Sequence, residues 1–194
     1  MKLVFATHNK NKAIEIQSLM PSGIEILTLD EIGCTEDIPE TADTLEGNAK
    51  IKADFVYEKY GYDCFADDTG LEVEALNNEP GVLSARYAGS AKDPEENIQL
   101  LLKNLNNQSN RKAQFRTVIA MRLKDETNLF EGIVIGQITF NKSGSDGFGY
   151  DPIFQPEDSQ RTFAEMSLVE KNTISHRARA LEKMLSYLRE NIDK

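Results

Sequence analysis

The chain has 194 residues, a formal net charge of −10 and 40% hydrophobic residues. That length fits one domain, or two small lobes that share one sheet, and the composition argues against intrinsic disorder. The acidic balance argues against a general nucleic-acid binder, and the lack of an apolar run of about 18 residues argues against a membrane-spanning segment. Cys34 and Cys64 match no zinc spacing, so we expect ordinary thiols in a reducing, cytoplasmic setting.

The first third of the chain predicts strands separated by helices. The apolar stretch Met1–Ala6 is too short for a signal peptide, and the mostly apolar run Lys2–Thr7 predicts a buried strand. Asn9–Met20 carries apolar residues at helical spacing, and Ile24–Leu29 alternates like a second strand. Residues 30–43 form an acidic stretch that we expect to be a loop.

A second helix follows the acidic loop. Asp43 and Glu46 have the spacing of a capping box, and apolar residues recur at helical spacing until Gly61. Asp63–Asp67 and Leu71–Leu76 then predict two short strands.

The remaining elements complete the predicted fold. Asp93 followed by Pro94 is typical of a helix start, and residues 114–123 and 129–140 predict two long strands in a hairpin. A last amphipathic helix can be capped by Ser175. Together these elements predict an α/β fold with a mixed central sheet and flanking helices.

The first candidate site is Thr7–Lys12, at the start of the first predicted helix. Backbone N–H groups and the dipole at a helix N-terminus attract phosphate, and Lys10 and Lys12 add positive charge to an acidic chain. The alternative is a capped helix with solvated lysines. The segment is no Walker motif, because it lacks the Gly-x-x-x-x-Gly-Lys pattern.

The second candidate site is Asp67-Asp68-Thr69-Gly70, which follows an apolar run. Adjacent carboxylates are tolerated best beside a cation or in water, and Mg²⁺ prefers such oxygen ligands, with substrate phosphates completing its shell. One aspartate could instead act as a general base on water. The alternative is an acidic turn between two strands, in which Gly70 permits the tight turn.

The acidic stretch and the helix after it add further candidates. Most carboxylates between residues 36 and 46 are expected to lie in a solvated loop, but one of them could reach a metal held by Asp68. Asn48 and Lys52 are four residues apart on the predicted helix and therefore share a face. The alternative for this pair is two exposed polar side chains.

Two later segments could recognise a base. In Gly147–Pro152 an aromatic residue stands between glycines, so Phe148 can be exposed and stack on a base, while Asp151 could accept hydrogen bonds from a ring or sugar. The donors of Lys171 and of Ser175-His176-Arg177 could read a purine edge. The alternatives are a bare turn and a structural histidine.

Six ordered segments resemble those of one family and extend over nearly the whole chain. Each segment alone is a modest signal, but six in order are specific. They are Ala6–Glu15 (Ala-Thr-x-Asn-x-x-Lys-x-x-Glu), Ala66–Val73, Pro80–Gly89, Gly147–Pro152, Glu170–Asn172 and Ile174–Arg177. Together they resemble the inosine triphosphate pyrophosphatases, also called noncanonical purine nucleoside triphosphate pyrophosphatases.

The resemblance implies a reaction and the residues that perform it. Such enzymes use Mg²⁺ to hydrolyse ITP, dITP and XTP between the α- and β-phosphates, giving the monophosphate and pyrophosphate. Asp68 matches the proton acceptor and also a metal contact, and Glu40 lies where the family places a further metal carboxylate. With Lys52 added, the expected substrate-binding residues are Thr7, His8, Asn9, Lys10, Asn11, Lys12, Lys52, Thr69, Phe148, Gly149, Tyr150, Asp151, Lys171, His176 and Arg177.

The resemblance also implies an overall organisation. We expect a single domain over residues 1–194, an elongated fold with two lobes and a central cleft, and a cytoplasmic homodimer that cleans the nucleotide pool. Its partner would be a small-molecule nucleotide, with no nucleic acid and no membrane. Donors from His176 or Arg177 would favour O6 of hypoxanthine or xanthine over the amino group of adenine. The sequence shows no means of rejecting GTP.

Two other functions remain open at this point. A pyrophosphatase for modified pyrimidine triphosphates could share the fold, but Gly147–Pro152 and Ser175-His176-Arg177 favour purines. A nucleotide-binding module without turnover would not need the Asp67-Asp68 pair. A purely structural domain would leave six ordered polar segments unexplained.

Overall fold

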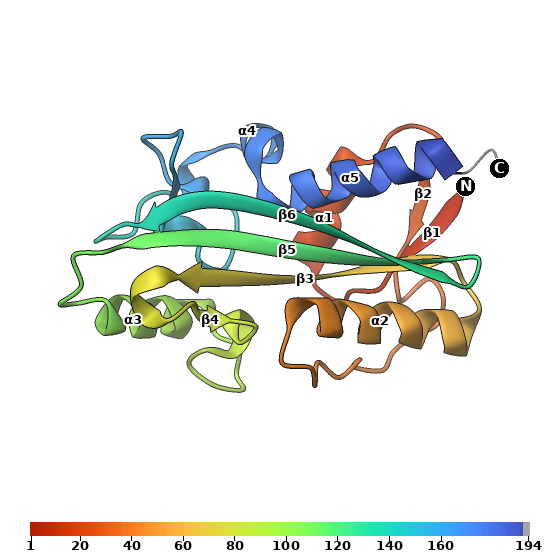
Figure 1. Ribbon diagram of the computed structural model, residues 1–194, viewed down its shortest axis with the longest axis horizontal. Coiled ribbons are helices and arrows are strands. Elements are labelled where there is room, and N and C mark those ends of the chain that lie inside the picture. The colour runs from red at the N-terminus through yellow and green to blue at the C-terminus, as the bar shows by residue number, and fades with distance from the viewer. Residues whose placement is uncertain (192–194) are drawn as a thin grey trace. The chain divides into compact units, whose positions relative to one another are not determined.

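Across residues 1–191, which are the residues that the computed structural model describes, the strands form a seven-stranded sheet. The strand order is β2-β1-β3-β5-β6-β7, and β4 pairs with β3 (Figure 1). β1 is parallel to β2 and β3, whereas β4 and β7 are antiparallel to their partners. The predicted α/β fold with a mixed sheet is therefore confirmed. The strands are β1 (Lys2–Phe5), β2 (Glu25–Leu27), β3 (Cys64–Val73), β4 (Glu79–Gly81), β5 (Lys112–Leu123), β6 (Glu126–Ile138) and β7 (Phe154–Pro156).

The helices agree with the sequence periodicity except for one short helix. The predicted helices at residues 9–20, 45–60 and from 94 onward are present, and the last one begins at His176. None of the helices within residues 1–191 is long and apolar enough to cross a bilayer. The α-helices are α1 (Lys10–Leu19), α2 (Leu45–Tyr60), α3 (Pro94–Asn104), α4 (Leu168–Ile174) and α5 (His176–Asn191).

The start of α2 differs from the prediction by one residue. Thr44, not Asp43, is the N-cap, and its hydroxyl oxygen accepts a hydrogen bond from the backbone N–H of Gly47 at 3.1 Å. Thr44 is the last residue with extended backbone before the helix, so its side chain is the one within reach of the first free N–H groups. The predicted end at Gly61 is confirmed, with a left-handed φ of 71°.

The prediction of two strands at Asp63–Asp67 and Leu71–Leu76 is wrong, because one continuous strand, β3, runs from the first into the second; the alternative of a turn at Asp67–Gly70 is therefore wrong too. Gly70 serves a different purpose there. A Cβ at this position would lie 2.7 Å from the carbonyl oxygen of Gly81 in the neighbouring strand β4, so glycine permits the close approach of the two strands. Since successive side chains of a strand point to opposite faces, Asp67 and Asp68 face opposite sides of the sheet.

The two long strands form the predicted hairpin. β5 and β6 are neighbours in the sheet and are joined by Lys124 and Asp125, which both have left-handed backbone, with φ of 48° and 68°. Two successive residues with positive φ are typical of the type I′ turn, whose twist matches that of the flanking strands.

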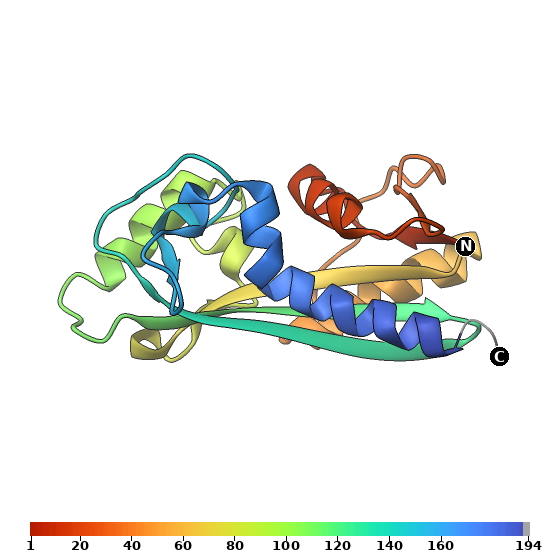
Figure 2. The ribbon, with the colours of Figure 1, turned by 90° about the horizontal axis from the view of Figure 1, so that it is seen from above.

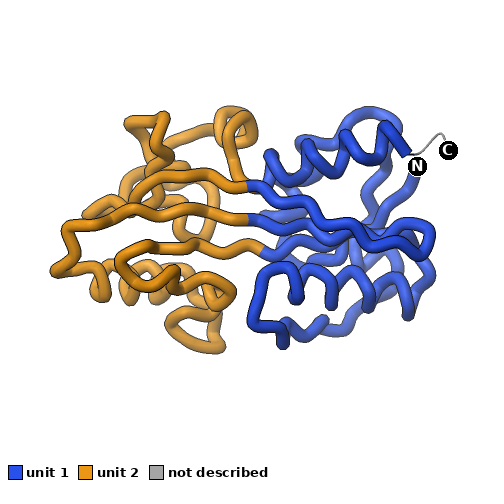
Figure 3. Tube along the Cα trace, viewed as in Figure 1, with its two compact units in different colours: residues 1–68, 117–132, 177–194 blue, residues 69–116, 133–176 orange. Residues whose placement is uncertain are grey.

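The chain divides into two compact units, coloured separately in Figure 3. Unit 1 comprises residues 1–68 and 117–132 and continues from Arg177 onward. On one face of its strands, α1 and α5 pack against Leu3 and Phe5 of β1, and on the other face α2 packs against Val4 and Ala6 (Figure 1). This strict alternation makes unit 1 a three-layer structure with apolar contacts on both faces of its sheet.

Helix α5 runs along β6 in both ribbon views (Figures 1 and 2). Its Tyr187 hydroxyl accepts a hydrogen bond from Asn128 at 3.1 Å, and its Lys183 donates to the carbonyl of Glu131 at 2.7 Å. Helix α5 is therefore held to strand β6 by polar contacts at its edge, and its apolar face packs in the core of unit 1.

Unit 2 comprises residues 69–116 and 133–176 and has its own core. Leu71 and Val73 of β3 belong to a buried apolar cluster with residues of α3. The rings of Phe115, Phe154 and Phe163 pack in the same cluster, with Phe154 centred 4.7 Å from Phe115 and 5.2 Å from Phe163. These rings also contact two candidate site residues, because His176 stacks on Phe115 and the ammonium of Lys171 lies 5.4 Å from the centre of Phe163.

Candidate active site

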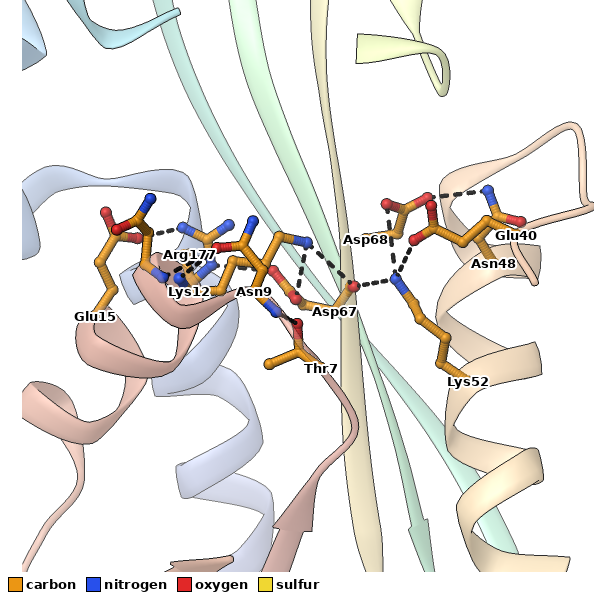
Figure 4. A network of polar contacts seen from close by, with 11 residues as sticks. Thr7, Asn9, Lys12, Glu15, Glu40, Asn48, Lys52, Asp67, Asp68 and Arg177 are labelled. Carbon is orange, nitrogen blue, oxygen red and sulfur yellow. Dashed lines mark hydrogen bonds and ion pairs between the residues drawn. The ribbon is translucent and has the colours of Figure 1, made fainter. Parts of the chain in front are cut away.

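Asp67 is the centre of a buried ionic network in unit 1 (Figure 4). Its Oδ1 accepts a hydrogen bond from Lys12 Nζ at 3.0 Å, and its Oδ2 accepts one from Arg177 Nε at 3.0 Å. Arg177 also pairs with Glu15, which is buried in α1. The network thus ties β3 to α1 and to α5.

The charges around Asp67 decide its protonation state. Burial by itself raises the pKa of Asp67, but the adjacent Lys12 and Arg177 outweigh it and hold the pKa well below its usual range. Burial lowers the pKa of Arg177 in turn, and the carboxylates of Asp67 and Glu15 more than restore it. Asp67 therefore stays ionised at neutral pH with both oxygens engaged, which makes it unsuited to accept a proton there.

Asp68 faces the other side of β3, toward α2 (Figure 4). Its Oδ2 accepts a hydrogen bond from Asn48 Nδ2 at 3.1 Å, and its Oδ1 lies 3.9 Å from Lys52 Nζ. Burial, only partly offset by Lys52, raises the pKa of Asp68. Two neighbouring carboxylates with pKa values shifted in opposite directions are the arrangement expected when one of them works as a general base.

Lys52 shows how a cation fits between the carboxylates of unit 1. Its Nζ lies 2.7 Å from Glu40 Oε1 and donates to the carbonyl of Asp67 at 2.7 Å, besides its longer contact with Asp68. Burial lowers the pKa of Lys52, but Asp68 and Glu40 raise it above its usual value. Two carboxylates from different segments thus converge on one positive charge.

The donor set fits Mg²⁺ when substrate supplies the remaining ligands. Within residues 1–191 no group of three or more His, Cys, Asp or Glu side chains gathers as a complete metal site. Mg²⁺ is usually bound through one or two carboxylates, with waters and substrate phosphates filling its shell. Glu40 and Asp68 supply two carboxylates, and both lie within 4 Å of one cation, the ammonium of Lys52.

The segment Thr7–Lys12 forms the capped start of α1. Asn9 is the N-cap, and its Oδ1 accepts hydrogen bonds from the backbone N–H groups of Asn11 at 3.0 Å and Lys12 at 3.2 Å. The hydroxyl oxygen of Thr7 accepts one from the N–H of Asn9 at 3.1 Å. The alternative of a capped helix is therefore present in the structure. Of the two lysines in its first turn, Lys10 is exposed, whereas Lys12 binds Asp67.

The other members of this segment are exposed. His8 Nε2 forms a hydrogen bond with the carbonyl oxygen of Glu36 at 3.0 Å, and Lys10, two residues after His8, lies at the surface. This contact links the segment to the acidic loop that carries Glu40. The sequence offered no signal for it, because the two residues are 28 positions apart.

A second set of candidate residues lies in unit 2, around Asp151. Its Oδ2 accepts hydrogen bonds from Lys171 Nζ at 2.6 Å and from the N–H of Phe148 at 2.8 Å. The ammonium of Lys171 also lies 5.0 Å from the centre of the half-buried Phe148 ring. A Cβ at Gly147 would stand 2.1 Å from Asp151 Oδ2, so glycine is required there, where φ is 74°. The loop is thus built around the Asp151 carboxylate.

The remaining unit 2 residues differ in exposure. His176 is buried, with its ring stacked on Phe115 at a centroid distance of 4.6 Å. Tyr150 is buried too, and its hydroxyl donates to the carbonyl of Ser84 at 2.9 Å. Thr69 and Gly149 are half-buried.

The structure therefore places the predicted residues in two sets, one in each unit. Glu15 and Asn48 join the unit 1 network. Asn48 was a candidate from its spacing to Lys52, but neither residue was among the substrate-binding and metal-binding residues expected from the resemblance. The signal for Asn48 was its helical spacing to Lys52, and the signal for Glu15 was its place three residues after Lys12 on one helix.

Acid should unfold the protein partly through Asp67. Its folded-state pKa lies below the ordinary 3.8, so its ionised form contributes stability that is present above about pH 4 and lost as the pH falls toward the lowered value. Asp68 contributes with the opposite sign, because its pKa is raised. We expect the urea midpoint, followed by circular dichroism, to fall between about pH 5 and pH 3, and to fall less steeply in Asp67→Asn. Equal slopes for the two proteins would contradict this assignment.

Comparisons with known proteins identify the family. The model of the Ham1 family matches residues 3–187. A dITP/XTP pyrophosphatase of Flavobacterium johnsoniae is 60% identical over 188 residues, which cover 97% of this chain and 98% of that protein. The solved Ham1 proteins of Staphylococcus aureus and Coxiella burnetii are 40% and 39% identical, with TM-scores of 0.89 and 0.90, and each alignment covers 98% of this chain and 99% of the other. With this fold, the Asp67-Asp68 pair in its strand and this similarity over nearly its whole length, the chain belongs to the Ham1 family.

Proposed function

We propose that the protein is a dITP/XTP pyrophosphatase, which hydrolyses ITP, dITP and XTP to the nucleoside monophosphate and pyrophosphate. Its similarity to the Flavobacterium johnsoniae enzyme of that name supports the reaction. The structural observation that carries the proposal is the contrast between Asp67, anchored by two cations, and Asp68, whose pKa is raised.

In the proposed reaction Asp68 accepts a proton from the attacking water. The water oxygen forms a bond to a phosphorus atom beside the α–β bridging oxygen, that P–O bond breaks, and its electron pair leaves with the departing phosphate group. Lys52 is poised beside Asp68 and supplies positive charge where the phosphates would carry negative charge. Glu40 and Asp68 would hold Mg²⁺, which when bound neutralises phosphate charge and polarises the P–O bonds.

The unit 2 set is proposed to recognise the purine. Phe148 offers a half-buried ring for stacking, and Asp151 holds Lys171 beside it. A donor from His176 would favour a purine with O6 over adenine, because adenine's amino group would face another donor. Arg177 binds its two carboxylate partners in unit 1, so its guanidinium is not assigned to this set.

Removing the aromatic ring should test the base-stacking role. Phe148→Ala is expected to weaken binding of ITP by about 1–3 kcal/mol, the usual contribution of one base on one aromatic ring. The matched control is Phe140→Ala, because Phe140 belongs to the same unit but is 74% exposed. Equilibrium binding of a non-hydrolysable ITP analogue measures the effect. An unchanged Kd and unchanged kinetics for Phe148→Ala would remove this ring from the site.

Assembly, location and metal use complete the proposal. We propose a cytoplasmic homodimer that requires Mg²⁺ and acts on free nucleotides, not on nucleic acid or at membranes. The net charge of −10 supports a free nucleotide over a nucleic acid as substrate. Light scattering of the purified protein, with and without nucleotide, measures the oligomeric state.

The decisive experiment is pyrophosphate release from ITP, XTP, ATP, GTP and UTP, each with Mg²⁺ and with EDTA. We expect metal-dependent turnover of ITP and XTP, with ATP and GTP at least about 100-fold slower, which is about 2.7 kcal/mol of discrimination. Turnover of UTP instead would keep the role of Asp68 but contradict the assignment of the purine site. Nucleotide binding without pyrophosphate release would favour a binding module and refute the enzyme.

A further inference from the structure

One buried amide joins the two carboxylate-bearing segments of unit 1. Asn48, in the first turns of α2, is completely buried. Its Nδ2 donates to Asp68 Oδ2 at 3.1 Å, and its Oδ1 accepts a hydrogen bond from the backbone N–H of Ala42 at 2.9 Å. Ala42 lies two positions after Glu40, at the end of the acidic loop. A single side chain therefore contacts both the candidate base and the backbone that carries the second candidate metal carboxylate.

The orientation of this amide is fixed by its partners. A backbone N–H can only donate, so the oxygen of Asn48 must face Ala42 and its NH₂ group must face Asp68. The amide group therefore presents a donor to the Asp68 carboxylate. It could present its oxygen there only by giving up the hydrogen bond from Ala42 of the acidic loop. Asp68 is in this way held from α2 at one of its two oxygens.

The residue before Asn48 supports the same docking of the loop. A Cβ at Gly47 would lie 2.5 Å from the Cβ of Ala42, a separation that real Cβ atoms do not adopt. Only glycine lets the loop approach α2 closely enough for the N–H of Ala42 to reach the Asn48 side chain. Gly47 and Asn48 together form the contact through which the acidic loop packs against α2.

Lys52 and Asn48 lie on the same face of α2 but contribute different interactions to the site. Lys52, one turn after Asn48, supplies positive charge to Glu40 and to Asp68. Asn48 is neutral, so it adds no charge to the site. Its two hydrogen bonds fix the orientation of the Asp68 carboxylate and the distance between that carboxylate and the acidic loop. Polar groups that orient metal-binding carboxylates from behind affect both metal affinity and activity.

We propose that Asn48 is a positioning residue, which aligns Asp68 with the Glu40-bearing loop so that both carboxylates can act on one metal ion and one water. The proposal rests on the hydrolysis proposed above for the same site. It predicts that loss of the amide impairs metal binding and the chemical step while nucleotide affinity is largely preserved.

The test compares three full-length variants with the wild type. Asn48→Ala removes both hydrogen bonds, whereas Asn48→Asp keeps an acceptor for Ala42 and places a carboxylate oxygen against Asp68. The control is Asn97→Ala in unit 2. Asn97 is 4% exposed and likewise makes one bond as acceptor, from Ala88 at 2.7 Å, and one as donor, to Ala85 at 3.1 Å. The three readouts are kcat and KM for ITP, the Kd of the free protein for Mn²⁺ from electron paramagnetic resonance, and the thermal midpoint.

The expected results separate positioning from stability. Asn48→Ala should lower kcat about 10–100-fold and weaken Mn²⁺ binding by a similar factor, with KM for ITP changed by less than about threefold. Asn97→Ala should lower the thermal midpoint comparably but leave kcat and the Mn²⁺ Kd within about threefold of wild type. Asn48→Asp should lose kcat like the alanine variant, since it preserves the loop contact but not the contact with Asp68.

Three outcomes would overturn the proposal. The first is that Asn48→Ala matches Asn97→Ala in kcat and in the Mn²⁺ Kd, which would make Asn48 a stabilising residue only. The second is that Asn48→Asp retains wild-type kcat. The third is a wild type that neither binds Mn²⁺ nor releases pyrophosphate. If the wild type binds Mn²⁺ but hydrolyses nothing, the proposed function fails while the Mn²⁺ comparison still decides the role of Asn48.

Discussion

Replacing Asp68 by asparagine should lower kcat for ITP by about 10²–10⁴-fold, the usual contribution of a general base. Nucleotide affinity should stay within about tenfold of wild type, because the substitution is isosteric and its amide oxygen can still accept the hydrogen bond from Asn48. Single-turnover measurement of pyrophosphate release separates the chemical step from binding.

The matched control for that variant is Asp125→Asn. Asp125 also lies in unit 1, but its carboxylate accepts a hydrogen bond from Tyr57 at the β5–β6 turn, and its left-handed backbone suits asparagine equally well. The control should hydrolyse ITP at the wild-type rate. An Asp68→Asn variant that turns over near that rate would mean that Asp68 is not the base, and the proposed mechanism would be wrong.

The second large effect should be on stability, from Arg177→Met. This change leaves the carboxylates of Glu15 and Asp67 buried without their guanidinium partner. Removing one partner of a buried ion pair typically costs about 3–5 kcal/mol, because the remaining charge stays desolvated. Urea unfolding without nucleotide, followed by circular dichroism, measures the loss in the free energy of unfolding.

The control for Arg177→Met is Lys2→Met. Lys2 pairs with Glu25 at 3.0 Å, but the two side chains are 65% and 55% exposed. Both variants remove one positive charge from the same acidic chain, so they share any general effect of net charge. Lys2→Met should leave the unfolding midpoint nearly unchanged, since exposed ion pairs contribute little. Equal losses for the two variants would show that the buried network adds nothing beyond net charge.

The sequence predicted the long elements well because their periodicity is strong. α1, α2, α3 and α5 and the β5–β6 hairpin each repeat an apolar pattern over many residues. The elements that were missed are short: β4 and β7 have three residues each and α4 has seven. For α4 the sequence does carry a signal, because Ser167 and Glu170 form a capping box.

The break predicted between the strands Asp63–Asp67 and Leu71–Leu76 shows where local signals mislead. Two aspartates, a threonine and a glycine in succession have the composition of a turn. The strand continues nevertheless, because Asp67 and Asp68 find cationic and amide partners on opposite faces of β3. A residue's own preference was overridden by contacts that form only in the folded chain.

For the site, the resemblance named the correct family, but the roles within the Asp67-Asp68 pair needed the structure. The family is confirmed by the Ham1 match and by the relatives. The difference between the two carboxylates depends on Arg177, which is 110 residues away from Asp67 in sequence, and on α2. No spacing rule connects positions so far apart. The individual site assignments therefore stay predictions that the substitutions above test.

The large sequence separation between Arg177 and its two carboxylate partners has a consequence for biosynthesis. Its two buried pairings close loops of 162 residues to Glu15 and of 110 residues to Asp67. When the chain emerges from the ribosome, the segment with both carboxylates is exposed long before the arginine that neutralises them is made. Contacts of such separation form late in folding, because the chain entropy lost in closing them is large. The interior of unit 1 is therefore completed only after Arg177 has been synthesised, and a polypeptide terminated before Arg177 would lack the guanidinium that pairs with Glu15 and Asp67.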